Sequence, residues 1–181
     1  MKKKVIVLLI LFFLCSASSV VFAFDVVDFG LGCATSFLLH ESAHWLVGNS
    51  TGRLEFVSKE SNPLQPWWIY YGNDKGLFKT AVAGFQMDWI VREYYLQKRP
   101  ESDIWKGMFW YTVYHHLLYC FDDGGDVRAI KESSGIRIGS VHSVLALLTA
   151  LDVYRYFHPE LPKINVLLIP KGIVLGYTIR F

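Results

Sequence analysis

The segment His40-Glu41-Ser42-Ala43-His44 contains the residue types that a catalytic zinc site needs, at the spacing of a helix. Residues four apart lie on one face of an α-helix, so the imidazoles of His40 and His44 can reach the same ion. Zn²⁺ favours such nitrogen ligands and keeps an open position in catalytic sites. Glu41 can take a proton from a metal-activated water. The segment therefore predicts two metal ligands and one catalytic base.

The residues around this motif favour a helix. Cys33 to Val47 contains no proline, and Gly48-Asn49 supplies a plausible stop signal. The alternative is a helix that carries two core or surface histidines and no metal, because a zinc site needs at least a third protein ligand.

The third ligand must come from a later part of the chain. Seven acidic or imidazole side chains in later segments are candidates: Asp88, Glu93, His115, His116, Asp122, Asp123 and Asp126. Adjacent helical residues point about 100° apart, so we expect at most one of His115 and His116 to face the site.

Asp123-Gly124-Gly125 follows an apolar segment, and together with the His-Glu-x-x-His motif it resembles zinc metalloproteases, most nearly those of the site-2-protease type. Those enzymes carry the histidine motif on an apolar helix and take the third ligand from a distant Asp-Gly motif. The resemblance implies His40, His44 and Asp123 as zinc ligands, with Glu41 as the base.

Two other carboxylates stay open as the third ligand. A second pattern among zinc metalloproteases takes a glutamate from a following helix, and Glu93 suits that arrangement. Asp126 lies close to Asp123 and is the next alternative.

Composition sets limits on the class of protein. The 181 residues suffice for one compact core, and we expect residues 24–181 to form a single domain. Hydrophobic residues make up 52% of the chain, which is apolar for a soluble protein. Lys2, Lys3 and Lys4 contribute three of the 18 basic residues, so removal of residues 1–23 leaves 15 basic against 16 acidic residues. No basic field remains to indicate nucleic acid.

The N-terminus is typical of an export signal. Three lysines precede the apolar run from Val5 to Leu14, and Val21-Phe22-Ala23 offers a cleavage site, which makes residues 1–23 a predicted signal peptide. The alternative is an uncleaved anchor from Val5 to Phe24, which is about long enough to span a bilayer. Either interpretation predicts export to the periplasm or to the cell-envelope membrane.

Hydrophobic periodicity predicts a mainly α fold: a bundle of about four apolar helices with one or two small β-hairpins. The helices are expected at 25–49, 77–97, 104–121 and 138–157, with a short segment at 127–132, and the hairpins at 53–71 and 164–181. Ionisable residues interrupt the apolar helices, which fits either an intramembrane metal site or an aqueous bundle.

These observations favour a zinc-dependent metallopeptidase of the cell envelope, a hydrolase that acts on a peptide or protein. Association with a membrane stays open, as do two alternatives. One is a non-catalytic envelope protein, and the other is an outer-membrane-associated protein whose C-terminal hairpin is the functional element.

Overall fold

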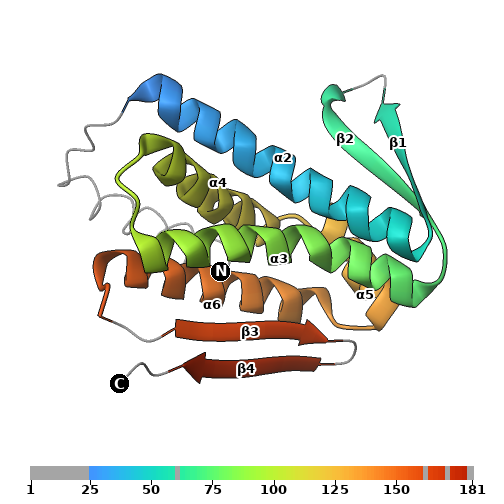
Figure 1. The fold of residues 1–181 in the computed structure, drawn as a ribbon. Coiled ribbons are helices and arrows are strands. Elements are labelled where there is room, and N and C mark those ends of the chain that lie inside the picture. Colours follow the sequence, from blue (N-terminus) through green and yellow to red (C-terminus); the bar gives the residue numbers. More distant parts are fainter. Residues whose placement is uncertain (1–24, 60–61, 161–162, 170–171, 179–181) are drawn as a thin grey trace.

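The structure is a computed structural model, and it describes residues 25–59, 62–160, 163–169 and 172–178. Five helices and two hairpins make up these residues (Figure 1). In chain order they are α2 (Val26–Thr51), β1 (Arg53–Lys59), β2 (Asn62–Tyr71), α3 (Asp74–Lys98), α4 (Asp103–Tyr119), α5 (Gly125–Ser134), α6 (Ile138–Phe157), β3 (Lys163–Ile169) and β4 (Gly172–Thr178). The predicted mainly helical bundle with small hairpins is confirmed. The predicted signal peptide lies outside the described residues.

The side chain of Asp25 fixes where α2 begins and its backbone ties this end to α4. Asp25 caps α2, because its carboxylate accepts from the backbone N–H groups of Val27 at 2.9 Å and Asp28 at 3.0 Å. The backbone N–H of Asp25 donates to the carboxylate of Asp103 at 2.7 Å. This bond joins the N-terminal ends of α2 and α4.

Two glycines let α2 and α4 approach closely. A Cβ on Gly32 would lie 2.0 Å from the carbonyl oxygen of Ile104, and one on Gly107 would lie 2.1 Å from that of Phe29. Each position has room for a hydrogen only, so the two backbones are in contact there. The close crossing brings the metal motif of α2 beside the C-terminal half of α4.

Helix α3 is the central element, with contacts to α2, α4, α5 and α6. Its first half packs in an apolar cluster with α5 and α6, made of Phe78, Ala81, Val82, Phe85, Val127, Ile130, Val141 and Leu145. Its last turns pack with α4 in a second cluster, made of Tyr95, Leu96, Phe109 and Val113. Between the two clusters α3 buries three charged residues, Asp88, Arg92 and Glu93.

Both hairpins are separate two-stranded antiparallel sheets. In the first, Arg53 pairs with Tyr71, and the register shifts between Val57 and Lys59. Strand β2 contains Pro63 and Pro66, which this sheet tolerates because each of its strands has a free edge. The second hairpin pairs β3 with β4, from Lys163 opposite Thr178 to Ile169 opposite Gly172.

A helix that crosses a bilayer must be both long and apolar. Among the described residues, none of the helices combines the length and the apolar character that crossing a bilayer requires.

Candidate metal centre

Three side chains from two helices converge on one point in the interior. His40 and His44 lie on the buried face of α2, one turn apart, and Asp126 comes from the first turn of α5. The two Nε2 atoms are 3.0 Å apart. Oδ2 of Asp126 lies 3.5 Å from Nε2 of His40 and 3.2 Å from Nε2 of His44. The structure thus brings both predicted histidines together with one of the three predicted carboxylates.

The triangle formed by these three atoms has the size of one face of a tetrahedral zinc site. Bonds of about 2.0–2.1 Å at tetrahedral angles separate neighbouring ligand atoms by roughly 3.4 Å. The observed edges of 3.0, 3.2 and 3.5 Å lie close to that value. Two imidazoles and one carboxylate are also a common ligand set of catalytic zinc, with the fourth position left for water. The residues present therefore fit a zinc ion.

Hydrogen bonds on the far side of each imidazole fix which nitrogen faces the centre. Nδ1 of His44 lies 2.7 Å from the carbonyl oxygen of Thr80, and Nδ1 of His40 lies 3.0 Å from Oδ2 of Asp88. Both partners are acceptors, so each Nδ1 carries a proton and donates it. Each Nε2 can then offer its lone pair to a metal, the arrangement usual for metal-bound histidines.

Gly84 of α3 leaves the space that the centre occupies. A Cβ at this position would lie 2.4 Å from Nε2 of His44 and 2.5 Å from Nε2 of His40. Real Cβ atoms essentially never approach so closely, so any other residue would displace the imidazoles. The sequence contains nothing that marks this glycine as different from the others.

The carboxylates raise the pKa of both histidines. Burial alone would lower the pKa of His40, but the charges of Asp88 and Asp126 outweigh it and raise the pKa to about 10. Burial likewise opposes a raised pKa at His44, where Asp126 prevails. Burial would raise the pKa of Asp126, but the two imidazoles hold it well below its usual range. In the absence of an ion, protons therefore occupy the place of the cation.

The turn before α5 and the end of α4 position Asp126. Gly125 adopts a φ of 51°, in the left-handed region that glycine enters without strain, and the helix continues directly from it. The hydroxyl of Tyr119, the last residue of α4, donates to Oδ2 of Asp126 at 2.9 Å. This bond holds the carboxylate oxygen that faces the histidines.

The structure does not bring Asp123 or Glu93 to the histidines. Asp123 has a side chain that is 73% exposed, and its nearest basic partner is His142 at 3.5 Å. Glu93 is buried on α3 and forms an ion pair with Arg155 at 2.8 Å. Asp126 fills the position because α5 begins at Gly125 and turns its first carboxylate inward, whereas Asp123 precedes the helix.

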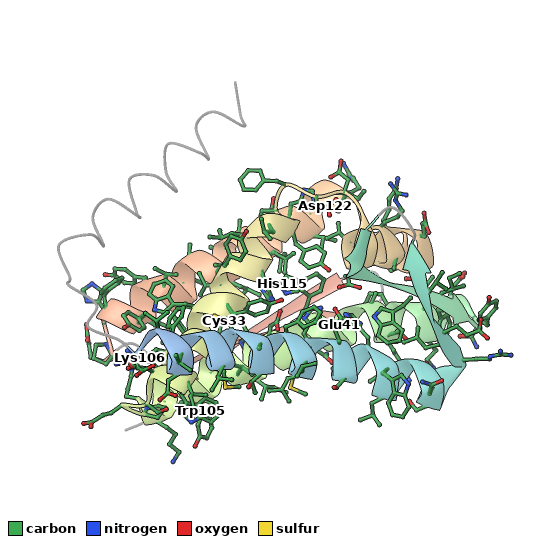
Figure 2. All side chains as sticks on the ribbon, turned by 90° about the horizontal axis from the view of Figure 1, so that it is seen from above. Cys33, Glu41, Trp105, Lys106, His115 and Asp122 are labelled. Atoms are coloured by element: carbon green, nitrogen blue, oxygen red, sulfur yellow. The ribbon has the colours of Figure 1, made fainter. Side chains whose placement is uncertain are left out.

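Glu41, the predicted base, lies on α2 between the two histidines in sequence and is half-buried. Its Oε2 accepts a hydrogen bond of 2.5 Å from Nε1 of Trp68, on strand β2. Figure 2 labels Glu41 on α2 and His115 on α4. The first hairpin therefore contacts the side chain that would carry out proton transfer.

Sequence reasoning missed how residues around the ligands act together. His115 and His116 were expected to diverge, yet both contact Asp88 at 3.2 Å, the first through Nδ1 and the second through Nε2. Asp88 was a candidate ligand, and it instead contacts the far side of His40. The sequence around His115 and His116 contains no pattern that predicts their shared contact with Asp88.

Comparison of the chain with family models, curated proteins and solved structures finds no match. The similarity to zinc metalloproteases therefore rests on the residues of the motifs themselves.

Proposed function

We propose that this protein is a zinc-dependent metallopeptidase of the cell envelope, with His40, His44 and Asp126 as ligands. The observation that supports the proposal is the triangle of Nε2, Nε2 and Oδ2 atoms with edges of 3.0, 3.2 and 3.5 Å. Three electron-pair donors converge there, and both imidazoles are held by acceptors on their far sides. A site for a divalent cation accounts for this better than a structural histidine pair.

A zinc ion in this place would polarise the scissile carbonyl and lower the pKa of a water toward ~7. Glu41 stands next to the first ligand in the chain and supplies the carboxylate for proton transfer. It would take a proton from the attacking water and give it to the leaving amine, so that the peptide bond breaks into a free acid and a free amine.

Trp68 keeps Glu41 in place for this role. The indole N–H donates to one carboxylate oxygen of Glu41, so the other oxygen is left for the attacking water.

The test compares wild-type protein with Glu41→Gln and with Glu132→Gln, an exposed glutamate on α5 that serves as the matched control. Zinc content is measured by atomic absorption, and hydrolysis is measured with a library of fluorogenic peptides. We expect about one zinc per chain in all three proteins. Glu41→Gln should lower the turnover by about 10²- to 10⁴-fold, and Glu132→Gln should leave it unchanged.

The other outcomes separate the alternatives. Zinc retained in a wild-type protein that cleaves no peptide would indicate a structural metal site in a non-catalytic envelope protein. Wild-type protein that takes up no zinc, even after resupply, would overturn the proposal. Equal turnover in wild type and Glu41→Gln would leave zinc in place but exclude Glu41 as the base.

A further inference from the structure

A chain of buried polar contacts leads away from the metal centre on the far side of His40. Its first member is Asp88, which is almost fully buried. Three imidazoles approach the same carboxylate oxygen, Oδ2: His40 through Nδ1 at 3.0 Å, His115 through Nδ1 at 3.2 Å and His116 through Nε2 at 3.2 Å. A carboxylate can only accept, so a nitrogen that binds it must carry a proton.

Arg92 determines which nitrogen of His116 carries its proton. Nη2 of Arg92 lies 3.0 Å from Nδ1 of His116. A guanidinium group has donors only and stays charged in proteins, so Nδ1 of His116 must be the acceptor. The ring is then neutral, and its one proton sits on Nε2, which faces Asp88. Burial and the charge of Arg92 together lower the pKa of His116 to about 3, in agreement with a neutral ring.

We propose that Arg92 is a positioning residue that sets the tautomer and orientation of the metal ligand His40, acting through His116 and Asp88. Arg92 donates to Nδ1 of His116, the protonated Nε2 of His116 faces Oδ2 of Asp88 at 3.2 Å, and the same oxygen accepts from Nδ1–H of His40. The remaining nitrogen of His40, Nε2, is thereby left to face His44 and Asp126. The inference rests on the metal centre proposed above.

Contacts with α6 fix the position of Arg92. Its side chain is fully buried, and it contacts two residues of α6: Asp152, whose Oδ2 lies 3.2 Å from Nε, and Thr149, whose hydroxyl lies 3.3 Å from Nη1. A buried guanidinium with these partners has little freedom to turn. Helix α6 thus contributes to the metal centre although none of its residues touches it.

The same argument decides against a second metal ion at Asp88. His40, Asp88 and His115 have ligand atoms within 4.8 Å of one another. An ion there would need the lone pair of Nδ1 of His40, but that nitrogen carries the proton when Nε2 faces the metal centre. The charge of His40 and hydrogen bonds from the surrounding imidazoles instead hold the pKa of Asp88 well below its usual range despite burial.

The test uses two substitutions of the middle residue. His116→Gln provides one acceptor for Arg92 and one N–H donor for Asp88, whereas His116→Leu provides neither. Zinc affinity is measured by competition with a chromophoric chelator, and the cobalt-substituted proteins are compared by visible absorption. Losing such an outer partner costs about 10- to 100-fold in metal affinity, so we expect that loss for His116→Leu and near wild-type affinity for His116→Gln. Circular dichroism checks that both variants are folded.

A second measurement needs no metal. In metal-free protein labelled with ¹⁵N-histidine, the NMR shifts of His116 should report a proton on Nε2 and none on Nδ1. A proton on Nδ1, or a charged ring, would overturn the inference, as would equal affinity losses in the Leu and Gln variants. If wild-type protein binds no zinc, the proposed function fails. The NMR measurement then still tests the contact of Arg92 with His116, because it reports the tautomer of His116 without a metal.

Discussion

Two buried polar clusters contact α3 and differ in how their charges are matched. One is the metal centre of His40, His44 and Asp126. The other is an ion-pair network of Glu93 and Asp152 with Arg155 and Arg92, which joins α3 to α6. In the network each carboxylate faces a guanidinium, at 2.8 Å for Glu93 and at 3.2 and 3.3 Å for Asp152. In the metal centre, three electron-pair donors face one another.

This difference is the reason that we propose an ion for one cluster and not for the other. A buried charge is tolerated when an opposite charge and hydrogen bonds accompany it. The network meets that condition with its own residues. The charge of Glu93 is already balanced by Arg155, so this carboxylate does not need a metal ion. The metal centre meets it only with a cation or with protons on its histidines, whose pKa the neighbouring carboxylates raise.

The largest effect that tests this comparison is the loss of Asp126. Asp126→Ala removes one of three ligands, so zinc affinity should fall by more than the roughly 100-fold that outer partners can cost. Asp123→Ala, three residues earlier and exposed, is the matched control and should bind zinc as wild type does. Isothermal titration of zinc into both variants measures the difference. The opposite result, with zinc lost in Asp123→Ala alone, would move the third ligand to the site-2-protease position.

The second effect concerns the network and should appear in stability rather than in zinc binding. Arg155→Met leaves Glu93 buried without its guanidinium, and breaking such a pair costs about 3–5 kcal/mol. Urea unfolding of the zinc-loaded protein measures it. The double variant Glu93→Gln, Arg155→Met removes both charges and should recover much of the loss. If Arg155→Met also weakens zinc binding, Arg155 as well as Arg92 couples the network to the metal centre.

The sequence predicted the helices of this protein well because local patterns determine them. Helix α6 has the predicted limits, Ile138–Phe157, and the strands of the C-terminal hairpin, Lys163–Ile169 and Gly172–Thr178, each begin one residue before the predicted run. Helix α3 begins earlier than predicted, since Asn73 caps it and its side chain accepts from the N–H of Gly76 at 2.9 Å. Whether the two hairpins form one sheet depends on tertiary packing, which a local pattern does not contain.

The candidate site was predictable only where its chemistry is local. His40 and His44 could be found because helical spacing alone places them on one face. Asp126 could not be chosen over Asp123, because the choice depends on the residue at which α5 begins. The partnership of Asp88 with His40 joins residues 48 positions apart, and the motif contains no trace of it.

The third effect tests the space that the metal centre needs. Gly84→Ala would place a methyl group within 2.5 Å of both ligand nitrogens, so the imidazoles must shift and zinc affinity should fall about 10- to 100-fold, as it does when ligands lose their orientation. Gly139→Ala on α6 is the control, since a Cβ there meets nothing within 4 Å. Competition with a chromophoric chelator gives both affinities. Unchanged binding in Gly84→Ala would mean that the ion sits elsewhere.

The smallest effect concerns Tyr119. Changing this residue tests the orientation of the ligand Asp126 without removing the ligand. Tyr119→Phe removes only the hydroxyl that donates to Oδ2 of Asp126, so the carboxylate stays but loses one of the contacts that hold it. Zinc affinity should fall about 10-fold, at the low end of the range for outer partners. Tyr114→Phe, on the exposed side of the same helix, is the matched control and should change nothing. The cobalt spectrum distinguishes two causes. A shifted spectrum means that Asp126 binds in a new orientation, whereas an unchanged spectrum with lower affinity means that the hydroxyl only pre-orders the carboxylate before the ion arrives. No loss of affinity would show that the start of α5, with Gly125 in the left-handed region, is sufficient to aim Asp126 at the histidines.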